Sequence, residues 1–372
     1  MKRILLLISV IIIAVISLGI KTAAAEIDIF DNELRQLEDS IPDDTSNGLK
    51  DLGINGINDV SQGTDISKLF NYAADTLLGY SKGPMSSMMI LICIVLIASI
   101  AESYTYSLRY THTKDIMNIA VSLMTVSTII TPIAELSSDT VAVIKGSSSI
   151  MLIYLPVMAG IMAFSGHMIA SAGYYTAVVT AAGFLSKISS AVLAPLLNIF
   201  LSLAVCSGIN GRIKLGGIIE IAAKWFKWIL TFAVSMFAAV VGMNAALSGA
   251  GDSLTARASK FALSSFIPLI GPSVAEAYQT LQSSLSLLRS GMGVFVIISI
   301  IVSFLPVMAR ILLWSLTVGV SKLIAEAFSV TSANQIFTAI SSFLSALRAV
   351  IIGVLIAFVI STAVMIHIGG SS

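Results

Sequence analysis

The stretch LTARASKFALSSFIPLIGPSVAEAYQTLQSSLSLLRSGMG, residues 254–293, decides how the fold of this chain is interpreted. Its centre is an apolar run that two prolines and a glycine interrupt. Proline removes a backbone donor and clashes with the preceding turn, so one helix cannot run through this centre unbroken. Among membrane spans, a broken helix is tolerated only where protein or a water-filled cavity covers its backbone groups. We therefore predict a re-entrant helical hairpin over residues 254–290, with its tip formed by Phe266, Ile267, Pro268, Gly271 and Pro272.

An amphipathic pattern follows the break. Val274, Tyr278, Leu281 and Leu285 recur at helical spacing, and polar residues lie between them. An amphipathic loop at the membrane interface explains this pattern equally well, because periodicity indicates an apolar face and not a depth in the bilayer. Both alternatives presuppose a membrane protein.

The composition supports that class. The chain has 372 residues, of which 56% are hydrophobic and 11% charged, whereas soluble domains carry about 25% charged residues. The sequence therefore predicts an all-α, polytopic integral membrane protein surrounded by membrane lipid. Its basic residues are scattered between apolar runs, so nucleic-acid binding is not expected. Cys93 and Cys206 lie inside apolar runs and have no disulfide or metal-site spacing.

The N-terminus is typical of a secretory signal peptide. Lys2 and Arg3 precede an apolar run, and small residues at 23–25 offer a cleavage site before Glu26. We expect residues 1–25 to be a signal peptide, with an uncleaved membrane anchor as the alternative. In either case the chain from Glu26 onward is extracytoplasmic.

The next segment, residues 26–84, is acidic, and we call it the arm. Between residues 26 and 80 it carries twelve acidic and three basic residues. It has too few apolar residues to build a large core of its own. We expect it to dock on the membrane domain or on a partner, with a flexible solvated arm as the alternative.

Residues 85–372 are predicted to form a polytopic membrane domain. About eight apolar runs are long enough to span a bilayer, near residues 85–104, 116–135, 149–166, 168–186, 189–208, 228–248, 292–313 and 347–367. If Glu26 is outside, nine basic residues, Arg310 and Arg348 among them, fall on the cytoplasmic side, and four, including Lys145, fall outside. This distribution agrees with the positive-inside rule, and it places both termini outside the cytoplasm.

Two runs carry small residues at every fourth position. Such seams let helices approach closely in lipid, where hydrophobicity does not drive helix association. We predict that they pack helices within the chain, although an Ala- and Gly-rich sequence can produce the pattern by chance. The seam residues are Ala238, Gly242, Ala246, Ala250, Ala349, Gly353, Ala357 and Ser361.

Catalysis is not expected. Residues 79–83, GYSKG, match the G-x-S-x-G motif of serine hydrolases, but that motif requires a strand before the serine and an activating His/Asp pair. Here a helical pattern precedes Ser81 and Pro84 opens a span. The sequence contains no nucleotide-binding loop and no His/Cys metal cluster. We predict no catalytic residue, no cofactor and no metal.

The order of these elements, together with residues 256–277 carrying Arg257, Lys260, Pro268 and Gly271, resembles the stage III sporulation protein AE family over nearly the whole chain. The resemblance implies a multi-pass protein of the mother-cell membrane that surrounds the forespore. Its implied partners are the other stage III sporulation A-operon proteins and stage II sporulation protein Q of the forespore. The implied role is a permease-like subunit of a channel or secretion complex, with a separate ATPase-like subunit, needed for late forespore gene expression.

Two other functions stay open on the sequence. A stand-alone secondary transporter of a small solute would favour intramembrane charges or paired broken helices, and this chain has one clear broken segment. A non-conducting membrane scaffold would use the acidic arm to recruit partners.

Overall fold

The computed structural model describes residues 35–39, 41–57, 66–108, 111–165, 168–188 and 271–368, together with isolated positions between 195 and 239. These residues form helices, and no strand occurs among them, which confirms the all-α class. The elements are α2 (Asp43–Asp51), α4 (Ile66–Gly79), α5 (Lys82–Leu108), α6 (Thr111–Phe164), α7 (Met168–Ile188), α10 (Gly271–Ala327) and α11 (Thr331–Ile368).

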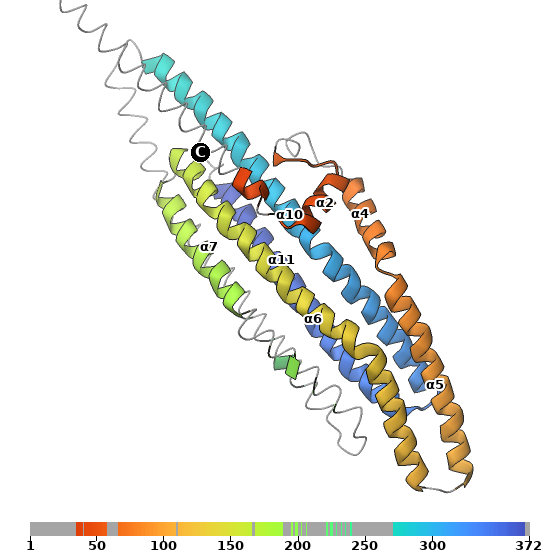
Figure 1. Cartoon of the computed structure of the whole chain (residues 1–372). Helices are drawn as coiled ribbons and strands as arrows, with labels where there is room; N and C mark the ends of the chain where they lie inside the picture. The colour runs from red at the N-terminus through yellow and green to blue at the C-terminus, as the bar shows by residue number, and fades with distance from the viewer. Residues whose placement is uncertain are drawn as a thin grey trace, which may run out of the picture.

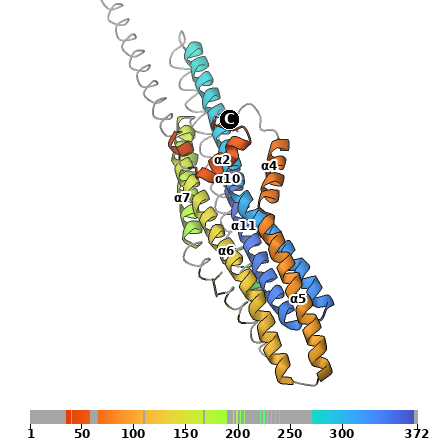
Figure 2. The same cartoon turned by 45° about the vertical axis from the view of Figure 1, so that its right-hand side comes forward.

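Two antiparallel pairs of long helices make up the body. α5 lies antiparallel to the first half of α6, and α10 lies antiparallel to α11; the two pairs pack side by side (Figures 1 and 2). α7 packs along the second half of α6, and α2 and α4 lie against α10. One buried apolar cluster extends through all of these contacts.

The α10–α11 turn shows how tightly this pair is connected. Ser329 adopts a left-handed conformation with φ 57°. The amide of Val330 donates to the carbonyl of Ala325 at 2.9 Å, and that of Ser329 donates to Glu326 at 3.1 Å. This is a Schellman motif, which satisfies the last carbonyls of a helix. Glycine usually occupies the left-handed position, so the serine at 329 is only a weak sequence signal for this turn.

α6 differs from the expectation of two spans joined by an outside loop. Residues 116–135 and 149–166 were predicted as separate helices, but α6 is a single helix of 54 residues, about 81 Å long at 1.5 Å per residue. In the predicted loop, Leu136, Thr140 and Ile144 lie on one helical face and are completely buried. The prediction is wrong because the packing of this face keeps a less apolar stretch helical.

The other predicted spans have different outcomes. Residues 85–104 and 168–186 are helical in α5 and α7, and 292–313 and 347–367 are parts of the longer α10 and α11. Residues 189–208 and 228–248 lie outside the described chain except for isolated positions, so the total of eight is not established. In the described part, four helices are long and apolar enough to cross a membrane: Lys82–Tyr104, Ile116–Phe164, Ser290–Ala327 and Thr331–Ile366.

The predicted hairpin lies partly outside the described residues. Phe266, Ile267 and Pro268 belong to that undescribed part, so a dip of the tip into the membrane stays a prediction. Gly271 and Pro272 begin α10; proline is accepted in a first turn, where its missing N–H has no intrahelical partner in any case. α10 then continues unbroken through Ser290. The chain therefore does not reverse at the second end of the hairpin.

The arm is docked. Its apolar residues Leu37, Ile41, Leu49, Leu52, Ile54 and Ile57 are at most 7% exposed and belong to the common core. The Ile57 amide donates to Glu38 Oε1 at 3.1 Å and closes the segment on itself. Gly48 lets α2 approach α10 closely, because a Cβ there would lie 2.6 Å from Cγ1 of Val302. The solvated-arm alternative therefore does not hold for residues 35–57.

Candidate functional site at the charged cluster between α6 and α10

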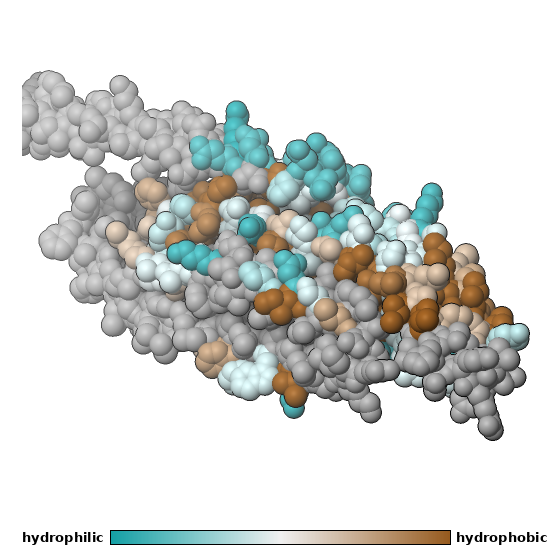
Figure 3. Space-filling model, turned by 60° about the horizontal axis from the view of Figure 1, so that its bottom comes forward, coloured by the Kyte–Doolittle hydropathy of each residue, from teal (hydrophilic) through white to brown (hydrophobic). Residues whose placement is uncertain are grey.

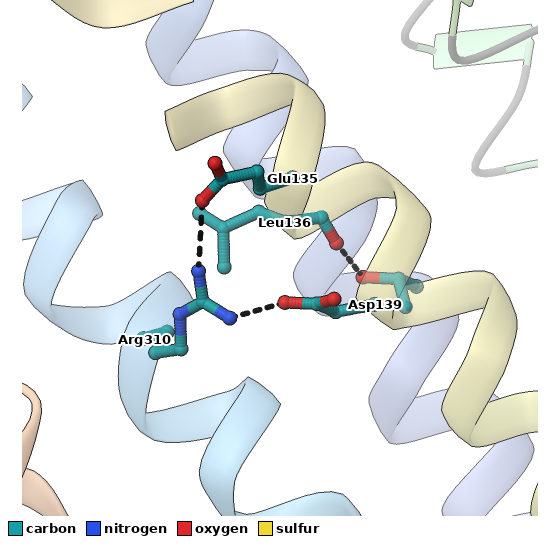
Figure 4. Close-up of polar contacts among 5 residues, drawn as sticks. Glu135, Leu136, Asp139 and Arg310 are labelled. Carbon is teal, nitrogen blue, oxygen red and sulfur yellow. Dashed lines mark hydrogen bonds and ion pairs between the residues drawn. The ribbon is translucent and has the colours of Figure 1, made fainter. Parts of the chain in front are cut away.

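A cluster of charged side chains joins α6 to α10 at mid-length. Arg310 of α10 donates from Nη1 to Oδ2 of Asp139, and its Nη2 lies 3.6 Å from Oε2 of Glu135 (Figure 4). The two carboxylates are four residues apart, which brings them to the same face of α6. The guanidinium carbon also lies 5.9 Å from the ring centroid of Tyr80, within cation–π range.

The cluster is half open to its surroundings. The side chains of Arg310, Asp139 and Glu135 are 25%, 38% and 61% exposed. With one positive and two negative groups, it carries a formal charge of −1. A single charge at a bilayer centre costs about 2.5–3.5 kcal/mol, so charges in membrane helices are normally paired and lie near water. The pairing and exposure of this cluster fit a position at an edge of the hydrocarbon region.

Two prolines flank the cluster. Pro132 precedes Glu135 in α6, and Pro306 precedes Arg310 in α10. Inside a helix, proline leaves the carbonyl four residues earlier without its N–H partner, and this weakens the helix locally. Both helices are therefore weakened next to the ion pairs that join them, and α6 has a second interior proline, Pro156, farther along. The cluster can therefore link α6 to α10 through ion pairs, and it keeps the three charged side chains at the same depth relative to the membrane.

Comparison with known proteins identifies the family. The model of the family described as stage III sporulation protein AE matches residues 50–369. The chain belongs to this family. It is 21% identical over 151 residues to stage III sporulation protein AE of Bacillus subtilis (strain 168), a match that covers 41% of this chain and 38% of that relative. No solved structure matches. Membership of the stage III sporulation protein AE family confirms the resemblance seen in the sequence and supports a role in sporulation.

The cluster corrects the sidedness expected for this member of the stage III sporulation protein AE family. The eight-span layout places Arg310 on the cytoplasmic side and the loop around Lys145 outside. The contact between Arg310 and Asp139 puts these residues at the same depth. The layout fails here because one α6 helix replaces two predicted spans, so the opposite sides that it assigns to residues 136–148 and to Arg310 do not agree with the contact between Asp139 and Arg310.

The second small-residue seam lies on α11. Ala357 and Ser361 are buried, and Ala349 and Gly353 are half-buried. The hydroxyl of Tyr174 in α7 donates to the carbonyl of Ser361 and lies 3.1 Å from its Oγ. Ser361 thus lies in a helix contact, while the role of the seam as a whole stays a prediction. The first seam, Ala238, Gly242, Ala246 and Ala250, lies outside the described residues.

Sequence reasoning did not identify the charged cluster. The two signals that could have found it are carboxylates four residues apart at the end of an apolar run and a single arginine between two apolar stretches.

The motif around Ser81 does not lie in a strand–turn–helix arrangement, because helices precede and follow it. Ser81 Oγ donates to the carbonyl of Leu78 at 2.7 Å at an exposed helix end. Among the described residues, no group of three or more His, Cys, Asp or Glu side chains could hold a metal ion.

Proposed function

We propose that this protein is the permease-like membrane subunit of a sporulation channel or secretion complex that links the mother cell and the forespore. In this role it lies in the mother-cell membrane around the forespore, with both termini extracytoplasmic, and it supports late forespore gene expression. It acts without catalysis or a cofactor. Its partners are the other stage III sporulation A-operon proteins and, directly or through them, stage II sporulation protein Q.

Buried hydroxyls in the α10–α11 pair carry the preference for a conducting subunit. Ser321 is completely buried and Ser332 is 5% exposed, and neither hydroxyl has a hydrogen-bond partner among the residues that the structure describes. An unsatisfied buried polar group costs about 1–3 kcal/mol. Water in a transport path, or a polar group of a partner subunit, would remove this cost. A bundle that served as inert packing would gain stability from apolar residues at these positions.

A single substitution tests the conducting role. We expect Ser321→Val to reduce late forespore gene expression while the protein level in the membrane stays unchanged. The matched control is Thr125→Val, because Thr125 is also completely buried but its hydroxyl already donates to the carbonyl of Val121 at 2.8 Å. A forespore reporter would measure expression in sporulating cells. Full expression with Ser321→Val would exclude the conducting role at this position.

The docked arm favours a second candidate, a non-conducting scaffold. Asp39, Asp43, Asp44 and Asp51 are exposed on the arm, where a partner can reach them. Affinity capture from sporulating membranes distinguishes a stand-alone transporter from a channel subunit and from a scaffold. Recovery of the other complex members would support a channel subunit or a scaffold, and capture of this chain alone would favour a stand-alone transporter. Full expression with Ser321→Val, together with recovery of the complex, would then favour the scaffold over the channel subunit.

A further inference from the structure

The long helices exceed the thickness of a bilayer. α6 has 54 residues and α10 has 57, which gives lengths of about 81 and 86 Å, against a hydrocarbon core of about 30 Å. One bilayer therefore covers less than half of either helix.

The charged cluster divides the body into two parts. The loop half comprises residues 82–108, 111–135, 311–327 and 331–347, and the arm half comprises residues 140–164, 290–309 and 349–366.

The loop half exposes its large apolar side chains. Ile97 of α5 is 67% exposed, Ile116 of α6 is 69% and Leu323 of α10 is 65%. Along 140–164, 290–309 and 349–366 of the arm half, the most exposed large hydrophobic side chains are Phe164 at 52%, at the end of α6, and Ile356 at 46%. In the space-filling view of Figure 3, exposed hydrophobic side chains, coloured brown, are concentrated toward the right-hand end of the face shown. Side chains that point outward and are apolar over the thickness of a bilayer fit a lipid environment.

The arm excludes lipid from one side of the arm half. Gly48 packs next to Val302, and Ile57 lies beside Gly291, where a Cβ would be 3.9 Å from the Ile57 carbonyl oxygen. The arm therefore runs along residues 291–302 of α10. Its Asp43 and Asp44 are exposed, and ionised carboxylates do not lie in the hydrocarbon region. The apolar 290–309 stretch of α10 is therefore covered by a water-exposed segment of the same chain.

The dimensions of the loop half match one bilayer. The apolar part of α5, Lys82–Tyr104, has 23 residues, or about 35 Å. It begins at Lys82, two residues after Tyr80, whose ring centroid lies 5.9 Å from the guanidinium carbon of Arg310, and this places the start of α5 near the charged cluster. The charged cluster thus lies at one edge of the apolar belt, and the α10–α11 turn lies at the other.

We propose that the bilayer surrounds the loop half alone, and that the arm half stands in water on the side of the arm as an extramembrane extension of the same helices. Hydropathy alone assigns 290–309 and 349–366 to the membrane; the docked arm and the charged cluster assign them to the aqueous side. The lipid-facing surface is then the exposed apolar face of α5, the first half of α6 and the last part of α10.

Cysteine accessibility tests this placement. Single cysteines at Val294 and Ile356 in the arm half, and at Ile97 and Leu316 in the loop half, are introduced into a Cys93→Ser, Cys206→Ser chain. All four positions are exposed in the structure. The purified full chain is placed in lipid nanodiscs and treated with a membrane-impermeant maleimide. We expect the arm-half cysteines to react at least about tenfold faster than the loop-half cysteines, and detergent to remove the difference. Equal protection of all four positions would overturn the proposal.

A charge substitution provides a second measurement that does not depend on labelling chemistry. Ile356→Arg places a charge in the arm half, and Ile97→Arg places one in the loop half. We expect Ile356→Arg to accumulate in the membrane at the level of the unmodified chain and Ile97→Arg to be lost or degraded, because lipid does not accept a charge in mid-span. The reverse order, or equal loss of both variants, would place the arm half in lipid.

Discussion

Gly48→Ala measures how closely the arm is held against α10. Gly48 lies inside α2, where alanine would stabilise an isolated helix by about 1 kcal/mol. In the folded chain the added Cβ would lie 2.6 Å from Cγ1 of Val302 and would also clash with the hydroxyl of Tyr72. Real Cβ contacts under 3.0 Å essentially do not occur, so α2 or the side chains of Val302 and Tyr72 must shift. Overpacking of this kind costs about 1–3 kcal/mol.

The clash outweighs the helix propensity because Val302 belongs to a long, packed helix and is only 1% exposed. We expect the arm to open more easily by about 1–2 kcal/mol, which corresponds to amide exchange about 5–30-fold faster over residues 43–57. Hydrogen–deuterium exchange of the purified protein measures this. Gly79→Ala is the matched control, because nothing lies within 4 Å of a Cβ at that position.

A double variant isolates the contact. Val302→Ala removes the Cγ1 methyl group that the new Cβ would meet on α10 and leaves the contact with Tyr72 in place. Its combination with Gly48→Ala should cost about 1 kcal/mol less than the sum of the two single changes, since contacting residues are not additive. If amide exchange in Gly48→Ala is unchanged or slower than in the unmodified chain, the docking argument is refuted. Such a result would show that alanine stabilises α2 and causes no clash with α10.

Three further predictions concern single contacts. Arg310→Leu should lower the melting temperature by a few degrees, about 1 kcal/mol for a half-exposed pair, with Arg310→Lys closer to the unmodified chain; no change in either variant would show that the cluster does not hold α6 to α10. Ser81→Ala should leave sporulation intact, because the Ser81 hydroxyl bonds to its own helix end; lost sporulation at unchanged protein level would indicate catalysis. Tyr174→Phe should cost about 1 kcal/mol by removing the bond to Ser361, measured by thermal unfolding against Tyr175→Phe, and equal effects of the two changes would argue against it.

Several elements could be predicted because their signals are local. The apolar runs at 85–104 and 168–186 became α5 and α7, since an uninterrupted apolar run of span length has few alternatives to a helix. Pro272 was also correctly seen as incompatible with a helix interior, and it lies in the first turn of α10. The end of α10 carried a weak signal, because Ser329 takes a conformation in which glycine is expected.

The charged cluster could not be predicted in the same way. Arg310 and Asp139 are 171 positions apart, and their depths were assigned by counting spans. One miscounted helix, α6, was enough to place them on opposite sides. The continuity of α6 depends on the packing of Leu136, Thr140 and Ile144 against other helices, which no local pattern contains.

The amino-acid sequence by itself determined that this is a helical membrane protein, because its 11% charged residues leave long stretches that water does not favour. It also determined that the segment after the apolar N-terminus is acidic. The tertiary structure decided which apolar surfaces are buried against protein and which stay exposed. An apolar side chain such as Val302 or Ile97 is removed from water equally well by a docked arm or by a bilayer, so hydropathy cannot distinguish the two, and their positions in the fold do.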